Sequence, residues 1–192
     1  FGETRYTDYD KVGNIIAITD RNGAVRSYGY DSRDRKVSET WYQGPAILQV
    51  QGYGYDDNGN LTSATDPDGS YTFTHDKLNR VKTVDGPFGV AWTFDYDSNG
   101  NRTSAADNKG GVTVTGYDGL DRPVARTVSV AGADVATLGW TYEGTTGDLA
   151  ATTRTAAGGA TLTETFAYDT LGRQTGITYT SPSGSTSFTT TY

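Results

Sequence analysis

Residues 96–104 read Tyr96-Asp97-Ser98-Asn99-Gly100-Asn101-Arg102-Thr103-Ser104, and variants of this stretch return along the whole 192-residue chain. Every copy opens on a ring side chain followed by an acidic one: Tyr9-Asp10, Tyr30-Asp31, Tyr55-Asp56, His75-Asp76, Tyr96-Asp97, Tyr117-Asp118, the degenerate Tyr142-Glu143, and Tyr168-Asp169. The ring positions, taken on to Tyr192, lie 21, 25, 20, 21, 21, 25, 26 and 24 residues apart. Such a regular interval is typical of a repeat protein, whose units stack on their neighbours.

Two endings alternate after the ring-acid pair. One ending is Gly-Asn, at Gly13-Asn14, Gly59-Asn60 and Gly100-Asn101, with Gly147-Asp148 as a weaker copy. The other is an Arg four residues after the Asp, at Arg35, Arg80, Arg122 and Arg173. Asp can accept a hydrogen bond from the backbone two residues on, and Gly supplies the positive φ that a tight reversal needs. The full repeat unit is therefore predicted to be two hairpin-like halves.

The segments that close the halves differ in the same alternating way. Three Gly-Asn halves close with Asp-x-x-Gly, at residues 20–23, 66–69 and 107–110, whereas the Arg halves close with the variable segments 43–51, 85–89 and 131–137. We expect regular and irregular ends to lie on different sides of the assembled sheet. Variable segments could carry recognition, since loops do so more than scaffolds.

The residues before each pair predict strands. A second aromatic residue often stands two positions earlier, at Tyr28, Tyr53, Phe73, Phe94, Trp140 and Phe166. Positions i and i+2 of a strand share a face, so stacked repeats are expected to align their rings in ladders, with about 0.5–1.5 kcal/mol for each aromatic pair. Thr and Val fill the remaining strand positions, and no helical period is sustained. The prediction is an all-β repetitive antiparallel β-hairpin array, forming a spiralling strip, solenoid or partial shell, continuous over residues 1–192.

The pattern of residues 55–62 and of residues 96–104, combined with Tyr-Asp-x-x-x-Arg, resembles the YD repeat of Rhs proteins, of the C components of Tc toxins and of teneurins. The resemblance covers residues 9–192 and is specific because the motif recurs at fixed spacing. It implies a long β-strip that spirals into a hollow shell, which in the bacterial members commonly encases a toxic C-terminal domain. The self-cleaving residues of such shells are not assigned here, because residues 66–69 are only a repeat turn.

Composition narrows the class of protein. Sixteen Lys and Arg against 23 Asp and Glu give a net charge of −7, and without a basic patch nucleic acid is a poor partner. The chain has no Cys, so it has no disulfide or thiolate chemistry. No apolar run approaches the ~20 residues of a membrane span, and no signal peptide opens the chain. Because the sequence begins at Phe1 and stops at a repeat boundary, we expect a piece of a longer protein. We also expect that protein to be secreted or to lie at the cell surface.

Candidate sites for chemistry coincide with the repeat. His75, the one histidine, occupies a tyrosine slot, so we interpret it as a ring-for-ring replacement. Residues 95–100 match the opening of a calcium loop, but the twelfth position is Ala106 where a Glu belongs, and the segment is already explained as a turn. The N-glycosylation patterns Asn-x-Thr at residues 60–62 and 101–103 also coincide with the repeat motif, which would produce them without any glycan. A glycosidase uses a single pair of catalytic carboxylates, whereas the aspartates of this chain recur at the turns of every copy, so we interpret them as structural.

The aromatic residues leave one alternative open. Trp41, Trp92 and Trp140 could stack on sugars, or they could face the inner side of the sheet with the other rings. The preferred interpretation is a structural scaffold, a segment of a β-sheet shell around a toxin domain of the same polypeptide, with no catalytic, cofactor or metal site. The alternatives are an extracellular adhesion module that binds a glycan or a protein, and a filament that self-assembles through an unpaired edge strand.

Overall fold

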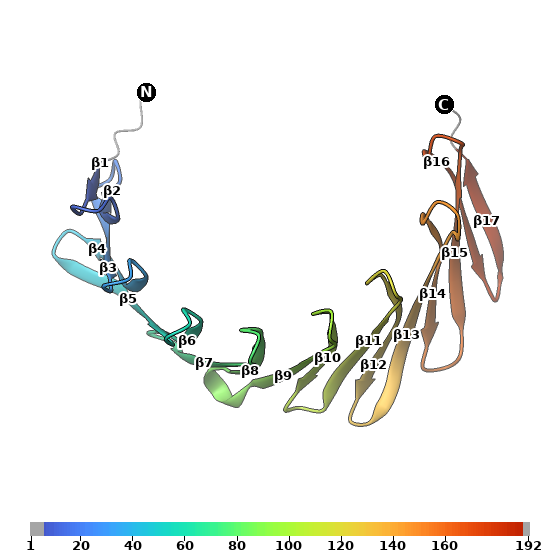
Figure 1. Cartoon of the computed structure of the whole chain (residues 1–192), viewed down its shortest axis with the longest axis horizontal. Helices are drawn as coiled ribbons and strands as arrows, with labels where there is room; N and C mark the ends of the chain where they lie inside the picture. Colours follow the sequence, from blue (N-terminus) through green and yellow to red (C-terminus); the bar gives the residue numbers. More distant parts are fainter. Residues whose placement is uncertain (1–5, 190–192) are drawn as a thin grey trace. The chain divides into compact units, whose positions relative to one another are not determined.

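A computed structural model describes residues 6–189, which form 17 β-strands and one short 3₁₀ turn (Figure 1). Backbone contacts divide the chain into two compact units, one up to Ala91 and one from Trp92. Within each unit, every strand pairs with its sequence neighbour in antiparallel register. The prediction of an all-β array of antiparallel hairpins is confirmed. In this part of the chain no helix is long and apolar enough to cross a membrane.

The first unit contains eight complete strands. Their bounds are β1 (Tyr6–Tyr9), β2 (Ile15–Thr19), β3 (Ala24–Tyr30), β4 (Lys36–Gln43), β5 (Ala46–Tyr55), β6 (Leu61–Asp66), β7 (Gly69–His75) and β8 (Val81–Asp85), and the 3₁₀ turn η1 (Pro87–Gly89) follows. The strands carry the Thr, Val and aromatic residues that suit a pleated surface, and turn residues separate them.

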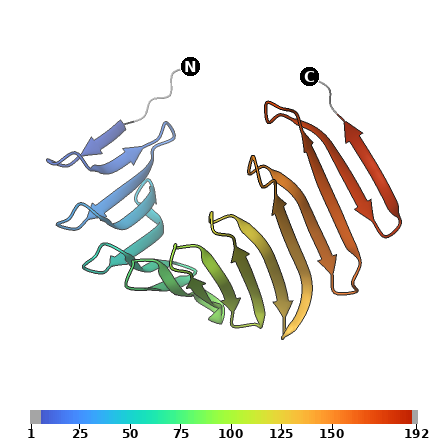
Figure 2. The same ribbon diagram turned by 45° about the vertical axis from the view of Figure 1, so that its right-hand side comes forward.

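The second unit continues the same alternation of strands and turns. Its strands are β9 (Ala91–Tyr96), which starts one residue earlier, β10 (Arg102–Asp107), β11 (Gly111–Tyr117), β12 (Pro123–Val130), β13 (Ala133–Tyr142), β14 (Leu149–Ala156), β15 (Thr161–Tyr168), β16 (Gln174–Ser181) and β17 (Gly184–Thr189). The hairpins of this unit, coloured from green to red, follow one another directly in Figure 2.

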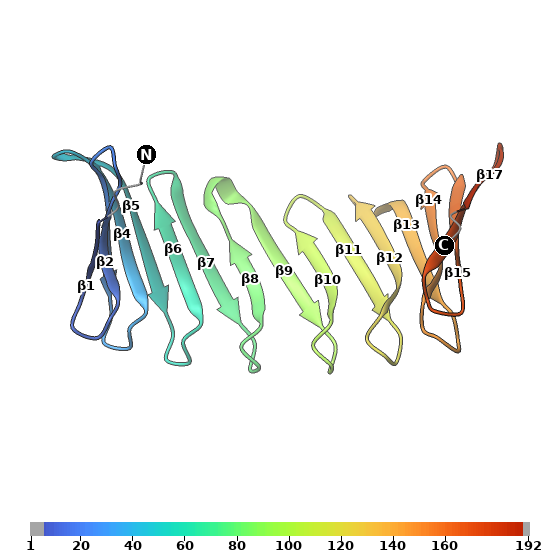
Figure 3. The same ribbon diagram turned by 90° about the horizontal axis from the view of Figure 1, so that it is seen from above.

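The turns of each unit fall on two edges (Figure 3). We call the edge with the ring-acid turns the YD edge; it holds residues 10–14, 31–35, 56–60 and 76–80 in the first unit, and 97–101, 118–122, 143–148 and 169–173 in the second. The opposite, closing edge holds residues 20–23, 44–45, 67–68 and 86–90, and then 108–110, 131–132, 157–160 and 182–183. The expectation that regular and irregular closing segments lie on different sides of the sheet is therefore wrong: both kinds lie on the closing edge, and the ring-acid turns lie on the other edge.

A register shift accompanies each ring-acid turn. The ladder shifts between Gly29 and Tyr30, between Gly54 and Tyr55, and between Gly116 and Tyr117, so one residue of the returning strand is left without a partner. Such a bulge bends a strand and increases its twist. Because it recurs at the same place in the repeat, it belongs to the motif as much as the turn does.

The cross-strand register gives the sheet two unlike faces. Tyr28 pairs with Glu39, which pairs with Gln51, so rings and charged groups share one face. The intervening Gly29 and Gly54 pair with serines on the other face, and a Cβ on Gly54 would lie 2.5 Å from the Ser63 hydroxyl. Most rings therefore lie on one face, and small residues such as Gly and Ser lie on the other, which also holds Val25, Tyr42 and Ile47.

Neither face is covered within the units. Among residues 6–189 no hydrophobic side chain is buried, and the buried residues are the polar Glu39 and Thr115. Each unit is therefore a single layer of sheet, without the two-layer core of an ordinary domain. Its stability must come from strand pairing, turn hydrogen bonds and half-buried rings.

We expect Gly100→Val to lower the free energy of unfolding by about 1–3 kcal/mol, because Gly100 has φ +97° and a β-branched residue resists that conformation. A Cβ there meets nothing within 4 Å, so the loss would report backbone strain alone. The measurement is chemical denaturation.

Gly119→Val is the matched control, since Gly119 lies in the next YD turn, has open space around its Cα and does not have a positive φ. Equal stability of the two variants would contradict the turn assignment.

Candidate functional site

The aspartate of each pair organises its turn. Asp97 accepts hydrogen bonds at Oδ1 from the backbone N–H of Asn99 (3.0 Å) and of Asn101 (2.9 Å). Its Oδ2 accepts a third bond from Nδ2 of Asn101, at 3.0 Å. Its own backbone N–H donates to the carbonyl of Asn101, and Gly100 N–H donates back to the Asp97 carbonyl. The expected Asx-turn is thus doubled by the asparagine side chain, as it is at Asp10-Asn14 and Asp56-Asn60.

The Arg-ending turns repeat this arrangement with a charged partner. Asp118 accepts the backbone N–H of Arg122 at 3.0 Å, and its Oδ2 accepts Nε at 2.8 Å and forms a 2.7 Å ion pair with the second guanidinium nitrogen. The two side chains keep only 23% and 29% of their exposure. A two-pronged, partly buried pair fixes geometry as well as adding energy. The same pairing occurs at Asp31/Arg35, Asp76/Arg80 and Asp169/Arg173.

The fourth residue of every one of these turns has a positive φ. In the Gly-Asn turns it is a glycine, but in three Arg-ending turns it is Asp34 (φ 59°), Asn79 (62°) or Asp121 (60°). The left-handed backbone of these three residues was not predicted from the sequence. Asp and Asn are the side chains that tolerate left-handed backbone best after Gly, so their presence between the pair and the Arg was a usable signal.

These residues also bind the preceding turn. Asn14 Nδ2 donates to Oδ1 of Asp34 at 3.0 Å, and Asn101 Nδ2 donates to Oδ1 of Asp121 at 2.7 Å. Asn60 makes the equivalent 2.8 Å bond to Asn79. Each Gly-Asn turn of this kind is thereby tied by its terminal amide to the Arg-ending turn that follows it.

The Arg-ending turns reach forward to the next turn in the same way. Arg35 donates to the carbonyl of Asp56 at 2.9 Å, and Arg33 donates to the carbonyl of Asp57 at 2.7 Å. In the second unit Arg122 donates to the carbonyl of Gly147 at 3.0 Å. Alternating amide and guanidinium bonds therefore run from turn to turn along the YD edge of each unit.

The tyrosine of most pairs forms a hydrogen bond to the preceding hairpin, unlike the aspartate, which bonds within its own turn. Its phenol donates to a backbone carbonyl in the strand that follows the preceding YD turn: Tyr30 to Ile15, Tyr55 to Lys36, Tyr117 to Arg102, Tyr142 to Pro123 and Tyr168 to Leu149, at 2.9–3.2 Å. These residues pair with the preceding strand but lie just outside the register with the following one; Lys36, for example, pairs with Tyr30, whereas the β4–β5 ladder begins at Ser38. The tyrosine thus satisfies an acceptor that the bulged register leaves over, and links consecutive hairpins.

Two copies depart from the Tyr-Asp motif, one at its ring and one at its acid. His75 fills a tyrosine slot, as expected, but its ring makes no such hydrogen bond within residues 6–189. In the seventh copy, Glu143 replaces the aspartate and the turn is one residue longer, closing from the Glu143 N–H to the Asp148 carbonyl at 2.8 Å. The Glu143 side chain does not form an Asx-turn. The backbone closes the reversal one residue later instead.

Among the described residues, contacts between a ring and a cation outnumber contacts between two rings. The guanidinium of Arg35 lies over Tyr55 at 4.7 Å, and that of Arg122 lies over Tyr142 at 4.0 Å. Tyr179 and Phe188 form an edge-to-face pair with centroids 6.0 Å apart. In the part of the chain that the structure describes, the predicted ladder of stacked rings is therefore replaced by cation–π contacts, and in two of them the terminal Arg of one turn lies over the next tyrosine.

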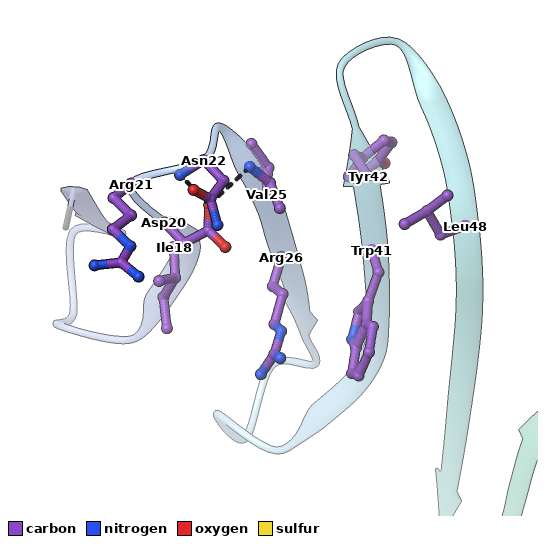
Figure 4. Close-up of a pocket in the computed structure, with 10 residues that line it drawn as sticks. Ile18, Asp20, Arg21, Asn22, Val25, Arg26, Trp41, Tyr42 and Leu48 are labelled. Atoms are coloured by element: carbon purple, nitrogen blue, oxygen red, sulfur yellow. Dashed lines mark hydrogen bonds between the residues drawn. The ribbon is translucent and has the colours of Figure 1, made fainter. Parts of the chain in front are cut away.

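A hollow lies beside a polar cluster on the first unit. Glu39, only 8% exposed, accepts hydrogen bonds from Lys36 Nζ (2.8 Å) and Trp41 Nε1 (2.6 Å), and Arg26 lies over the Trp41 ring at 4.3 Å. Burial favours a higher pKa for Glu39, but the bonds from Lys36 and Trp41 outweigh it and lower the pKa. The adjacent hollow measures about 380 Å³ (Figure 4); among the residues that line it are Ile18, Arg21, Val25, Trp41, Tyr42 and Leu48.

The side chains of the calcium-like segment and of the two glycosylation patterns are engaged in hydrogen bonds of the turns. Asp97, in the calcium-like segment, already accepts three hydrogen bonds from its own turn. The described residues contain no group of three or more His, Asp and Glu side chains placed to hold a metal ion. The amides of Asn60 and Asn101, the two sequon positions, are both engaged between turns. Trp92 is 36% exposed on β9, and Arg126 lies over Trp140 at 5.6 Å.

The comparisons with known proteins agree with this repeat. The family model for the RHS Repeat matches residues 9–40, 55–91 and 75–112. These segments are similar to the RHS repeat. The resemblance to the Rhs/YD-repeat family drawn from the sequence is thereby confirmed. A search of curated protein sequences finds no match.

Among solved structures, this chain is similar to a TcdB2-TccC3-Cdc42 structure (12% identity, TM-score 0.61) and to a TcdB2-TccC3-TEV structure (12% identity, TM-score 0.56). The alignments cover 92% and 91% of this chain but 11% of each of those chains. At this identity the likeness shows the fold alone. The chain thus spans about a tenth of the length of the structures that it matches.

We expect Tyr55→Phe to lower the free energy of unfolding by about 0.5–1.5 kcal/mol, the net contribution of one hydrogen bond. The substitution keeps the ring beneath Arg35 and removes only the bond to the Lys36 carbonyl. Chemical denaturation of both forms gives the difference. Tyr71→Phe is the control, since the Tyr71 phenol makes no hydrogen bond within residues 6–189; a loss of the same size there would contradict the assigned role.

The turn aspartates predict an acid-sensitive fold. The side-chain bond from Asn101 holds the pKa of Asp97 below its ordinary value of 3.8, and that from Arg122 does the same for Asp118. A lowered pKa in the folded state contributes stability above about pH 4 that is lost as the pH falls through the folded pKa. We therefore expect the melting temperature to fall between about pH 5 and about pH 2.5.

Asp118→Asn should make that acid-induced decline shallower, because one of the contributing carboxylates is gone. Asp68→Asn, which changes an exposed closing-edge residue, should leave the slope as in the unmodified chain. A slope that is unchanged by Asp118→Asn would show that the turn carboxylates do not cause the acid sensitivity.

Proposed function

We propose that this chain is one stretch of a continuous YD-repeat wall, a structural scaffold that contributes to a shell around another domain of the same polypeptide. The observation that carries the proposal is the single-layer sheet: no hydrophobic side chain is buried within residues 6–189, yet the rings gather on one face. A sheet with one half-exposed aromatic face is expected to be completed by something laid against it.

The enclosed domain is the partner that we propose for the aromatic face. The resemblance to Rhs proteins supports this choice, because their strips commonly encase a C-terminal toxin. The two TcdB2-TccC3 structures support it through the fold. On this proposal the small, hydroxyl-rich face is the wet outer surface, and the complete protein is secreted or extracellular.

The local geometry favours a scaffold over the other candidates. The turn carboxylates are each held by several turn donors, as at Asp97 and Asp118, so they are poorly placed to transfer protons or bind metal. Trp41 already has its indole N–H bonded to Glu39 and one ring face covered by Arg26, which leaves less of it for stacking on a sugar. Glycan binding stays an untested alternative.

Electron microscopy of the intact secreted polypeptide tests the proposal. The expected result is a closed shell whose wall contains this stretch, with density for a further domain inside. An open filament, or an isolated ribbon with both faces in solvent, would overturn it. A glycan array gives an independent check, since micromolar binding that Trp92→Ala or Trp140→Ala abolishes would favour the adhesion module instead.

A further inference from the structure

Three Asn-Gly pairs stand in exposed turns: Asn22-Gly23 on the closing edge, and Asn58-Gly59 and Asn99-Gly100 on the YD edge. Asparagine is a chemically labile residue, and it is most labile before glycine, which has no side chain to keep its backbone nitrogen away from the amide carbon Cγ. A Cβ on any of these glycines would meet nothing within 4 Å beyond its chain neighbours. Each pair therefore stands in open space, where its own chemistry can proceed.

The reaction of an Asn-Gly pair is a cyclisation followed by hydrolysis. The glycine nitrogen loses its proton to solvent and forms a bond to Cγ, the Cγ–Nδ2 bond breaks, and Nδ2 takes up a proton and leaves as ammonia. Water then opens the five-membered succinimide at either of its two carbonyls, which gives aspartate or isoaspartate. For the ring to form, the amide must turn toward the glycine nitrogen and give up any hydrogen bond that it makes elsewhere.

The glycine nitrogens are held alike in the three turns. Each donates to the carbonyl of the aspartate that starts its turn: Gly23 to Asp20 at 3.0 Å, Gly59 to Asp56 at 3.1 Å and Gly100 to Asp97 at 3.3 Å. If these bonds controlled the reaction, Asn99 would be the most reactive asparagine, because its glycine nitrogen has the longest bond.

The side-chain amides are held very differently. That of Asn22 makes no hydrogen bond within residues 6–189. Nδ2 of Asn58 lies 3.4 Å from Oδ1 of Asn79, at the limit of a hydrogen bond, whereas Nδ2 of Asn99 donates to the carboxylate of Asp121 at 2.8 Å. A short bond to a charged acceptor is the stronger restraint. The amides therefore give the reverse order of reactivity from the glycine nitrogens.

We propose that Asn22 is a site of spontaneous modification in the folded chain, and that the turn-to-turn bonds of the YD edge protect Asn58 weakly and Asn99 strongly from the same reaction. Asn22 lines the hollow beside Trp41, and so does Arg21 (Figure 4). Arg21 makes no ion pair within residues 6–189, so the new carboxylate would form next to a guanidinium without a partner. The inference is independent of the proposed function, because it depends on single turns and not on what the wall encloses.

Protection matters most at Asn99, because its product would disturb the YD edge. A carboxylate at residue 99 would face the carboxylate of Asp121, so that repulsion replaces a hydrogen bond. At residue 58 the facing group is the amide of Asn79, which can present its N–H₂ instead. We expect Asn99→Asp to lower the melting temperature by about 2–4 °C and Asn58→Asp to leave it unchanged. Equal melting temperatures would contradict this consequence.

Peptide mapping by mass spectrometry of the folded chain, kept at mildly alkaline pH, measures the rate of conversion at each site. We expect Asn22 to convert fastest, Asn58 next, and Asn99 at least about tenfold more slowly than Asn22, the ratio that one charge-assisted hydrogen bond produces. The same measurement in concentrated urea is the control, since the unfolded chain should convert all three at similar rates. An Asn99 rate equal to that of Asn22 in the folded chain, or the same order in urea, would overturn the inference.

Replacing the acceptor tests the protection directly. Asp121→Gly removes the carboxylate, and glycine suits the φ of +60° at this position. It should raise the rate at Asn99 several-fold. Asp34→Gly is the matched control, because Asp34 has φ +59° and accepts its turn-to-turn bond from Asn14, which no glycine follows. The control should leave the rate at Asn99 unchanged.

Should Asp121→Gly not fold, Asp121→Asn places at this position the neutral acceptor found at residue 79. It should bring the rate at Asn99 up to that at Asn58. A rate at Asn99 that no change of Asp121 alters would refute the protection.

Discussion

The structure depends on the carboxylate at the start of each YD turn. A single layer of sheet has no buried core to choose its register, so the turns must specify where each strand reverses. At Asp118 one side chain does this by accepting bonds from two backbone N–H groups and from the guanidinium of Arg122. An Asp at this place is short enough to reach its own turn, which the longer Glu143 does not do; there the turn lengthens by one residue.

The tyrosine extends that local order from one hairpin to the next. A tight turn fixes two strands, but a meander also needs each hairpin to be held against its predecessor. Lys36 pairs with Tyr30 in the preceding strand but has no register partner in β5, and the phenol of Tyr55 donates to its carbonyl across 19 residues of sequence. A buried acceptor without a partner is costly, so the hydroxyl matters beyond the ring that carries it. Ring, hydroxyl and aspartate therefore act as one motif, in which register, turn and hairpin stacking are fixed together.

The local parts of this motif could be predicted from the sequence, and the contacts between repeats could not. Asp followed by Gly at a fixed interval specifies a turn by short-range chemistry, so the turn at Asp97 and the strands around it follow from the residues themselves. The partner of Tyr55 depends on the register shift beside it, and no periodicity reveals a shift of one residue. The rings were accordingly expected to stack on one another, whereas Arg35 lies over Tyr55. Asp34 and Asp121 escaped notice for a related reason: their left-handed backbone and their bonds to the preceding turn appear only when two turns are placed side by side.

Such contacts explain why individual copies can degenerate without breaking the array. A hairpin is held by its own turn, in most copies by a phenol from the next hairpin, and by amide or guanidinium bonds to a neighbouring turn, as at Asp56-Asn60. In a linear array of this kind, stability is nearly a sum of unit terms and nearest-neighbour terms, so the loss of one term is confined to its own interface. His75 forgoes the phenol bond while the Asp76/Arg80 pair remains intact, and Tyr142 keeps its bond to the Pro123 carbonyl although the turn after it has changed.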